Sequence, residues 1–157
     1  MSCVLNCYKS GEKTVSTLKT DLTVANVMLP AHEIPVAPTS TILKEILDMM
    51  GRYRLGIVCI TNQAGKLEGV FTDGDVRRLL LKDQKPFAAL FNDDIGVHIT
   101  KNCTTTTADA PLTVAVDVMG SKRIWDLPVV GQDGVLVGLL HLHPAVSTLL
   151  DLRKRQE

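Results

Sequence analysis

The sequence lacks any excess of charge of one sign. Its 157 residues carry 17 Lys and Arg against 17 Asp and Glu, so no broad positive field is available to gather a phosphodiester backbone or anionic lipids. Nucleic acid and membrane surfaces are therefore not expected as partners. The chain also lacks an apolar run near the ~20 residues that a bilayer span requires. Residues 1–20 contain no hydrophobic block of a secretion signal, so we expect a cytoplasmic protein.

Paired cysteines are missing as well. The four cysteines, of which Cys3 and Cys7 are closest together, show no C-x-x-C spacing, and Cys59 lies in an apolar run typical of a buried strand. We expect ordinary thiols in a reducing compartment, with a redox or metal role for Cys3 and Cys7 as the alternative. With 45% hydrophobic and 22% charged residues, the chain should fold as one core or as two small cores that share an interface.

An internal repeat organises the chain. An offset of 69 residues aligns apolar, charged and glycine positions of two segments without a gap. The aligned pairs include Leu43 with Leu112, Met50 with Met119, Gly65 with Gly134, Gly69 with Gly138, and Leu80 with Leu149. At the start of each unit, residues 28–36 are two longer than residues 99–105, as a surface loop permits. Because neither unit is expected to be stable alone, we predict a pseudo-twofold pair in which the units pack on each other.

Each unit reads as helix, strand, turn, strand and helix. In the first, Thr39 or Ser40 is expected to cap a helix that runs to Met50, residues 56–60 and 67–71 form a hairpin, and a second helix starts near Asp75. In the second, Asp109 caps a helix through Met119, residues 127–130 and 135–141 form the hairpin, and Pro144 suits a first helical turn. The predicted class is α/β (α+β), with a small sheet on two helices in each unit.

The domain boundaries follow from the repeat. We expect an N-terminal lead or linker over residues 1–20, in which a docking helix is the alternative, and a charged tail over residues 153–157. The two repeats occupy the residues between, namely 21–90 and 91–152.

The most informative segment is residues 69–78, read G-V-F-T-D-G-D-V-R-R. It is a strand that ends in a hydroxyl, an acidic turn and a helix start. Amide groups at a helix start and the Thr72 hydroxyl can hold phosphate oxygens, while the Asp75 carboxylate can accept both hydroxyls of a ribose. Gly74 lets the backbone approach a ligand closely. The alternative is that Thr72 and Asp75 merely cap the helix.

This arrangement resembles the CBS repeat, whose nucleotide signature is a Thr or Ser followed three residues later by Asp. Three segments are similar to the CBS pair of bacterial arabinose-5-phosphate isomerases of the Kdo pathway. They are residues 27–28 followed by residues 33–35, residues 69–78 with the core T-D-G-D-x-R-R, and residues 138–143, read G-L-L-H-L-H. The middle segment is the most specific, and it also resembles CBS repeats fused to sugar nucleotidyltransferases. The resemblance covers nearly the whole chain after Asp21.

The resemblance implies one occupied nucleotide site per pair. In such pairs the Asp-bearing loop of one repeat faces the opening segment of the other. At Pro144 the family usually has Asp, and residues 99–101 replace its Met-Thr-Pro, which puts a second site in doubt. The predicted ligand-binding residues are Val70, Thr72, Asp73, Gly74, Asp75, Arg78, Ile99, Thr100, Thr106 and His141.

Four side chains in or near these segments, two arginines and two histidines, can also contact a ligand. Arg77 or Arg78 can reach an anionic group, with a solvated helix face as the alternative. His141 and His143 are spaced as two metal ligands can be, but no third ligand is evident, so no metal is expected and a polar contact near the pocket is favoured for His141.

The function that the resemblance implies is regulation. A nucleotide, AMP- or ATP-like or a CMP-sugar such as CMP-Kdo, would bind between the repeats and modulate an arabinose-5-phosphate isomerase. In such enzymes the sugar-isomerase domain precedes the CBS pair, and it would act here in cis or in trans. No catalytic residue and no catalytic cofactor are expected in this chain. A homodimer through the CBS helices is expected. The alternatives are a structural dimerisation module without a ligand and a CBS pair associated with a sugar nucleotidyltransferase.

Overall fold

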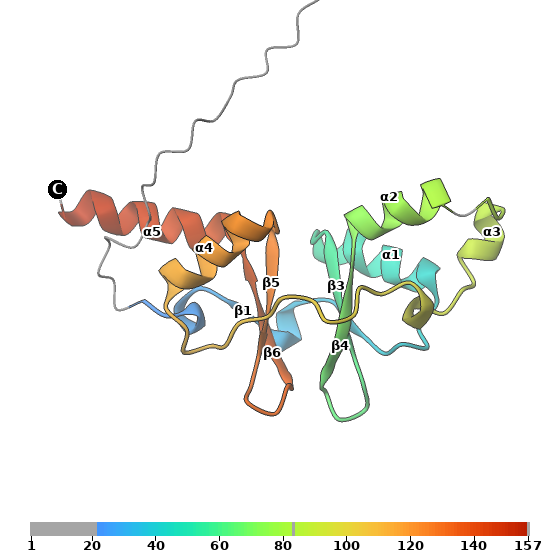
Figure 1. The fold of residues 1–157 in the computed structure, drawn as a ribbon, viewed down its shortest axis with the longest axis horizontal. Helices are drawn as coiled ribbons and strands as arrows, with labels where there is room; N and C mark the ends of the chain where they lie inside the picture. The colour runs from blue at the N-terminus through green and yellow to red at the C-terminus, as the bar shows by residue number, and fades with distance from the viewer. Residues whose placement is uncertain (1–21, 83, 157) are drawn as a thin grey trace, which may run out of the picture.

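The computed structural model describes residues 22–82 and 84–156, which form two similar series of elements placed side by side (Figure 1). Residues 1–20, with Cys3 and Cys7, lie outside the described part. The first series comprises β1 (Leu29–Pro30), β2 (Val36–Ala37), α1 (Leu43–Tyr53), β3 (Ile57–Thr61), β4 (Leu67–Thr72), α2 (Asp73–Lys82) and α3 (Phe87–Leu90). The second series comprises α4 (Leu112–Lys122), β5 (Asp126–Val130), β6 (Leu136–His141) and α5 (Leu142–Gln156).

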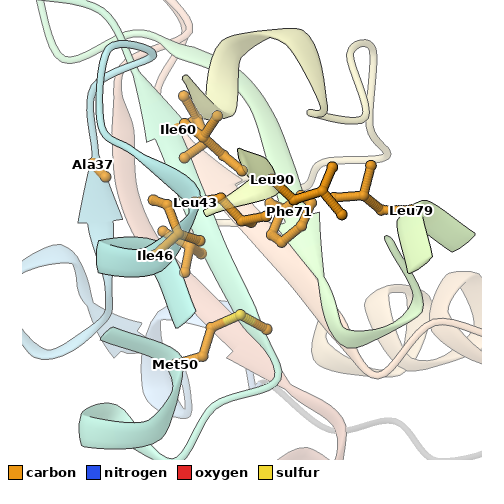
Figure 2. Packing of buried hydrophobic residues seen from close by; sticks show 10 residues of the cluster. Ala37, Leu43, Ile46, Met50, Ile60, Phe71, Leu79 and Leu90 are labelled. Atoms are coloured by element: carbon orange, nitrogen blue, oxygen red, sulfur yellow. The ribbon is translucent and has the colours of Figure 1, made fainter. Parts of the chain in front are cut away.

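Each half is a small sheet covered by helices, which confirms the predicted α+β class. One sheet has the order β2-β3-β4 and the other has the order β1-β6-β5. In the first half, α1, α2 and α3 bury apolar side chains against Phe71 of β4, which has no exposed surface (Figure 2). In the second half, the fully buried Leu140 takes the place of Phe71, 69 residues later. The period seen in the sequence is therefore the period of the two cores.

The halves exchange their opening segments. Strand β1, from the start of the chain's first unit, pairs antiparallel with β6 of the second unit, with Leu29 opposite Leu139. In return, Thr100 from the start of the second unit pairs antiparallel with Val70 of β4. The two hairpin tips also meet, where Lys66 bridges to Val135. These reciprocal pairings give the pseudo-twofold relation that the repeat predicts.

Two equivalent glycines make this exchange possible. A Cβ atom on Gly69 would lie 2.7 Å from the carbonyl oxygen of Thr100, and one on Gly138 would contact the carbonyl oxygen of Leu29. Both obstacles are backbone atoms, which cannot turn aside as a side chain can. The crossing strands therefore require glycine at these two positions of the repeat.

The predicted side-chain caps of α1 and α4 are wrong. Helix α1 begins after Ile42 and helix α4 after Pro111, and neither residue makes a side-chain cap. Instead the first amide of each helix donates to a backbone carbonyl of the other unit's opening segment. Leu43 donates to Asp93 at 3.0 Å, and Leu112 donates to Leu22 at 2.9 Å. The unpaired amides of a helix start are satisfied by the strand exchange, which local sequence does not reveal.

The other local predictions agree with the structure. The hairpins and the start of α2 lie within two residues of their predicted positions, and Pro144 lies in the first turn of α5. The two-residue difference between the unit starts corresponds to a short 3-10 helix at Ala31–Glu33, for which the second unit has no equivalent. Among the described residues, no helix combines the length and apolarity of a membrane span.

Candidate ligand-binding site

A cleft of about 840 Å³ lies between the two halves. The first half contributes the start of β3, the end of β4 and the first turns of α2, and the second half contributes its opening segment and the residues that lead into β5. Such a volume is within the range of small-molecule sites. The residues that line it include Thr72, Asp73, Asp75, Arg78, Thr100, Trp125, Asp126 and His141.

The loop between β4 and α2 is closed by reciprocal hydrogen bonds. The Asp75 carboxylate accepts the Thr72 amide at 2.9 Å and the Thr72 hydroxyl at 2.7 Å. The Asp75 amide donates to the same hydroxyl at 3.3 Å. Thr72 precedes the first residue of α2 and Asp75 is the third, so the two form a capping box. The capping alternative raised by the sequence is thus present in the structure.

The Asp75 carboxylate has two further donors. Its Oδ1 atom accepts a hydrogen bond from the Arg78 guanidinium and another, at 3.1 Å, from the hydroxyl of Thr100 in the opposite unit's opening segment. Asp75 is 8% exposed. Burial raises the pKa of its carboxyl, but hydrogen bonds from Thr72, Arg78 and Thr100 outweigh burial and hold the pKa below its ordinary value. The cleft therefore presents a buried, ionised carboxylate.

Across the cleft, His141 and Asp126 form a second polar pair. The His141 Nδ1 atom lies 2.7 Å from Asp126 Oδ1. Burial raises the pKa of the Asp126 carboxyl above its ordinary value, since the bond to His141 offsets only part of the effect and Asp73 nearby raises it further. His141 occupies the position of Thr72 in the second unit, and Asp126 occupies that of Ile57.

The mouth of the cleft carries cationic and aromatic side chains. Arg77, Arg78 and Arg123 line it and are exposed, and the Arg78 side chain retains 66% of its accessible surface although it is bound to Asp75. Trp125 also lines the cleft and is 70% exposed. The cleft thus combines carboxylates, cations and an exposed aromatic ring.

Eight of the ten residues predicted as ligand-binding line this cleft: Val70, Thr72, Asp73, Gly74, Asp75, Arg78, Thr100 and His141. The remaining two lie elsewhere. Ile99 packs against the core of the first half, and Thr106 pairs with β5 by accepting the Val130 amide at 2.9 Å. Their backbone places the opening segment, but their side chains do not face the cleft.

Sequence reasoning missed the wall that the second unit supplies just before and within β5. Ile124, Trp125, Asp126 and Pro128 all line the cleft. A signal was available in the repeat itself, because Trp125 aligns with Gly56 and Asp126 aligns with Ile57. The second unit thus has an aromatic and an acidic residue where the first unit has a glycine and an aliphatic residue. Such a difference between the units indicates positions that the shared fold does not constrain.

No metal centre is formed by the described residues, among which no group of three or more His, Cys, Asp or Glu side chains is gathered. Within the same residues, Cys59 is buried in β3 and Cys103 lines the cleft, both as free thiols. The predictions on Cys3 and Cys7 fall outside this part of the chain.

Comparison with known proteins identifies the family. The CBS domain family matches residues 24–82 and 93–143, which are the two halves of the repeat. The chain belongs to the CBS domain family. Two solved CBS-pair structures share the fold. CBSX2 in complex with AMP has a TM-score of 0.73 at 24% identity, over 83% of this chain and 98% of that one. The CBS pair of protein MJ0100, in complex with 5-methylthioadenosine and S-adenosyl-L-methionine, has a TM-score of 0.71 at 19% identity, over 85% and 99%.

Curated relatives of this CBS pair are longer proteins. An uncharacterised protein of Rickettsia prowazekii, RP505, is 30% identical over 83% of this chain and 39% of its own length. The arabinose 5-phosphate isomerase KdsD of Pseudomonas aeruginosa is 32% identical over 78% of this chain and 36% of its own length. The chain thus spans less than two fifths of the relatives it matches.

Proposed function

We propose that this CBS pair is a regulatory module that binds a nucleotide in the cleft between its halves, with Thr72 and Asp75 holding the ribose. The observation that carries the proposal is the buried, ionised Asp75 carboxylate at the wall of a ligand-sized cleft. A carboxylate can accept both hydroxyls of a ribose. The AMP complex of CBSX2, a protein of the same fold, supports a nucleotide as the ligand.

Arg78 gives the site a way to respond to its ligand. Its guanidinium is bound to Asp75 Oδ1. Ribose hydroxyls that donate to this oxygen would replace the guanidinium, and the released cation, at the mouth of the cleft, would pair with the phosphate. Arg77 and Arg123 add positive charge at the same mouth. Ligand binding would therefore exchange one hydrogen-bond arrangement of the α2 start for another.

The partner of the module in this proposal is an arabinose-5-phosphate isomerase, in cis or in trans, in the cytoplasm. The support is the 32% identity to KdsD over 36% of that protein. The regulating ligand would be an adenine nucleotide or a CMP-sugar such as CMP-Kdo, and the chain itself would not catalyse isomerisation. Regulation requires that the ligand bind two arrangements of the module with different affinity. A homodimer through the CBS helices would transmit the difference to the enzyme.

A second candidate function is a structural dimerisation module that binds no ligand. The observation in its favour is that Asp75 already accepts hydrogen bonds from the Thr72 amide, the Thr72 hydroxyl, Arg78 and Thr100. A carboxylate satisfied in this way serves as a helix cap without any ligand.

Thermal shift and calorimetry separate the two candidates. The wild-type chain is titrated with AMP, ATP, CMP and CMP-Kdo, and a ligand at 100 times its Kd should stabilise it by about 2.7 kcal/mol. The double variant Thr72→Ala with Asp75→Ala should lose binding. The exposed Asp151→Ala variant on α5 is the matched control and should bind as wild type does. Absence of a shift with all four ligands would favour the structural module.

A further inference from the structure

We propose that Trp125 and the Asp126–His141 pair form the nucleobase subsite of the cleft, and that this subsite selects bases with an exocyclic amino group. The inference rests on the proposed nucleotide site at Thr72 and Asp75 and adds the part of the ligand that those residues do not recognise. It assigns a binding role to the wall of the cleft that the second half supplies.

Trp125 is placed to stack on a planar ring. It lines the cleft, and 70% of its surface is exposed to solvent. An exposed indole offers a large apolar face at small conformational cost, and stacking on such a face suits every base. Because the chain contains a single tryptophan, its fluorescence reports on this wall of the cleft alone.

The ring lies on one side of the cleft. The equivalent position in the first half is Gly56, which has no side chain, and the Asp73 carboxylate lies 2.5 Å from the place of an added Cβ atom. Asp73 and Gly56 are held together by a hydrogen bond of 3.0 Å from the Asp73 amide to the Gly56 carbonyl. The first half therefore offers carboxylates where the second offers an aromatic ring, so a nucleotide has one orientation: ribose toward Asp75 and base toward Trp125.

Asp126 supplies a hydrogen-bond acceptor beside this ring. It follows Trp125 in the chain and lines the same cleft, and its side chain is 12% exposed. Its Oδ1 atom is engaged by His141 at 2.7 Å, whereas no residue in the described part of the chain donates to its Oδ2. A carboxylate oxygen accepts but does not donate, so it favours an amino group and repels a carbonyl at the same place on the ring.

Two pairs of nucleotides test this selectivity. AMP has an amino group where IMP has a carbonyl, and the adjacent ring nitrogen is an acceptor in AMP and a donor in IMP; CMP and UMP differ in the same way. By fluorescence quenching and calorimetry, the wild-type chain should bind AMP about tenfold more tightly than IMP and CMP more tightly than UMP, because the wrong partner leaves a buried polar group unpaired. In Asp126→Asn, Oδ1 remains the acceptor for His141 and the amide nitrogen faces the base. This preference should then disappear or reverse.

Two substitutions at Trp125 test stacking. Trp125→Ala should lower the affinity for AMP about tenfold, as measured by calorimetry. Trp125→Phe keeps an aromatic ring and should retain most of the wild-type affinity. Thermal melts verify that each variant is folded. Sedimentation of wild type and Trp125→Ala tests the competing role of the indole as a contact between copies of the chain.

Three outcomes overturn the inference while leaving the proposed function intact: equal affinity for AMP and IMP in the wild type, an unchanged preference in Asp126→Asn, or a Trp125→Ala variant that changes oligomeric state but not affinity. If none of the four nucleotides binds the wild-type chain, the proposed function fails first, and the base subsite fails with it.

Discussion

The two loops that begin α2 and α5 share a backbone arrangement and differ in every polar group. In the first, the Asp73 amide donates to Gly56 at 3.0 Å, and in the second the Leu142 amide donates to Trp125 at 2.9 Å. Yet the first loop reads T-D-G-D and the second reads H-L-H-P. The second lacks both the hydroxyl and the carboxylate of a capping box, because His141 and Pro144 replace Thr72 and Asp75.

This difference separates what the fold needs from what the site needs. Positions that build both halves are retained across the repeat, such as Gly69 with Gly138, where an opening strand crosses. Positions at the cleft have diverged, so that one half holds a carboxylate box and the other an aromatic ring with an acid–imidazole pair. A duplicated fold has in this way acquired a single asymmetric cleft.

The largest predicted effect concerns the two cores. Phe71→Ala should lower the free energy of unfolding by about 3–5 kcal/mol, and its twin Leu140→Ala by about 2–5 kcal/mol, since both side chains are fully buried. Because the halves exchange their opening segments, each variant should unfold in one transition. Circular dichroism reports the whole chain and Trp125 fluorescence reports the second half. For Phe71→Ala, a fluorescence midpoint left at the wild-type urea concentration would show that the halves unfold independently.

The capping box gives the next effect. Asp75→Ala removes a cap and leaves Arg78 and Thr100 without their shared partner, so the free energy of unfolding should fall by about 1–2 kcal/mol. Pro144→Ala at the twin position removes no hydrogen bond and should change stability much less. Urea unfolding compares the two variants. Equal losses would mean that the box contributes nothing specific to the first half.

The asymmetry can also be reversed. Adding Pro144→Asp to a His141→Thr chain, which has already lost the bond from His141 to Asp126, rebuilds the box at the start of α5 and should stabilise that chain by about 1 kcal/mol at neutral pH. The gain should vanish in acid, where the new carboxylate is protonated. Thermal unfolding at two pH values measures both results. A midpoint Tm that Pro144→Asp leaves unchanged at neutral pH would contradict the equivalence of the two loops.

The two cleft acids should respond to pH in opposite directions. The pKa of Asp75 is lowered in the folded chain, so its contribution to stability is present above its unfolded value of 3.8 and is lost as pH falls through the folded pKa. The pKa of Asp126 is raised, so its contribution is present below 3.8 and is lost as pH rises through the folded pKa. Relative to wild type, the loss in free energy of unfolding caused by Asp75→Asn should be smallest in acid. The free energy of unfolding of Asp126→Asn should instead rise relative to wild type as the pH rises. Urea unfolding over a range of pH measures both trends, and parallel curves of stability against pH for the two variants would refute the opposite pKa shifts.

The smallest effect concerns the thiols. Burial raises the pKa of Cys59 to about 12, with Cys103 and Asp126 adding to the shift, so Cys59 should resist iodoacetamide at pH 8 in the folded chain. Cys103 lines the cleft and should react slowly, and more slowly still with AMP bound. Peptide mass spectrometry follows each cysteine separately. Labelling of Cys59 at the rate of an unfolded thiol would contradict its burial.

Much of the fold could be predicted because the repeat is carried by apolar periodicity and turn residues, which depend on local sequence. The hairpins and the start of α2 follow from such patterns. The starts of α1 and α4 could not be predicted, because their first amides are satisfied by carbonyls of Asp93 and Leu22 from the exchanged segments. A local search for a capping side chain cannot reveal a partner that lies about fifty or ninety residues away in the chain.

The candidate site was predictable on one side only. Thr72 and Asp75 belong to a contiguous motif that the CBS resemblance makes visible, and both line the cleft. Trp125 and Asp126 have no motif and reach the cleft through the packing of the halves. The side-chain positions of Ile99 and Thr106 depend on strand pairing, which alternates faces and is sensitive to a one-residue shift.

The most direct test of the asymmetric cleft is the stoichiometry of AMP binding by calorimetry. We expect one AMP per chain in the wild type and none in the variant that combines Thr72→Ala with Asp75→Ala. Two equivalent AMP molecules per chain, or one that persists in the double variant, would contradict a single ribose site at the capping box of the first half.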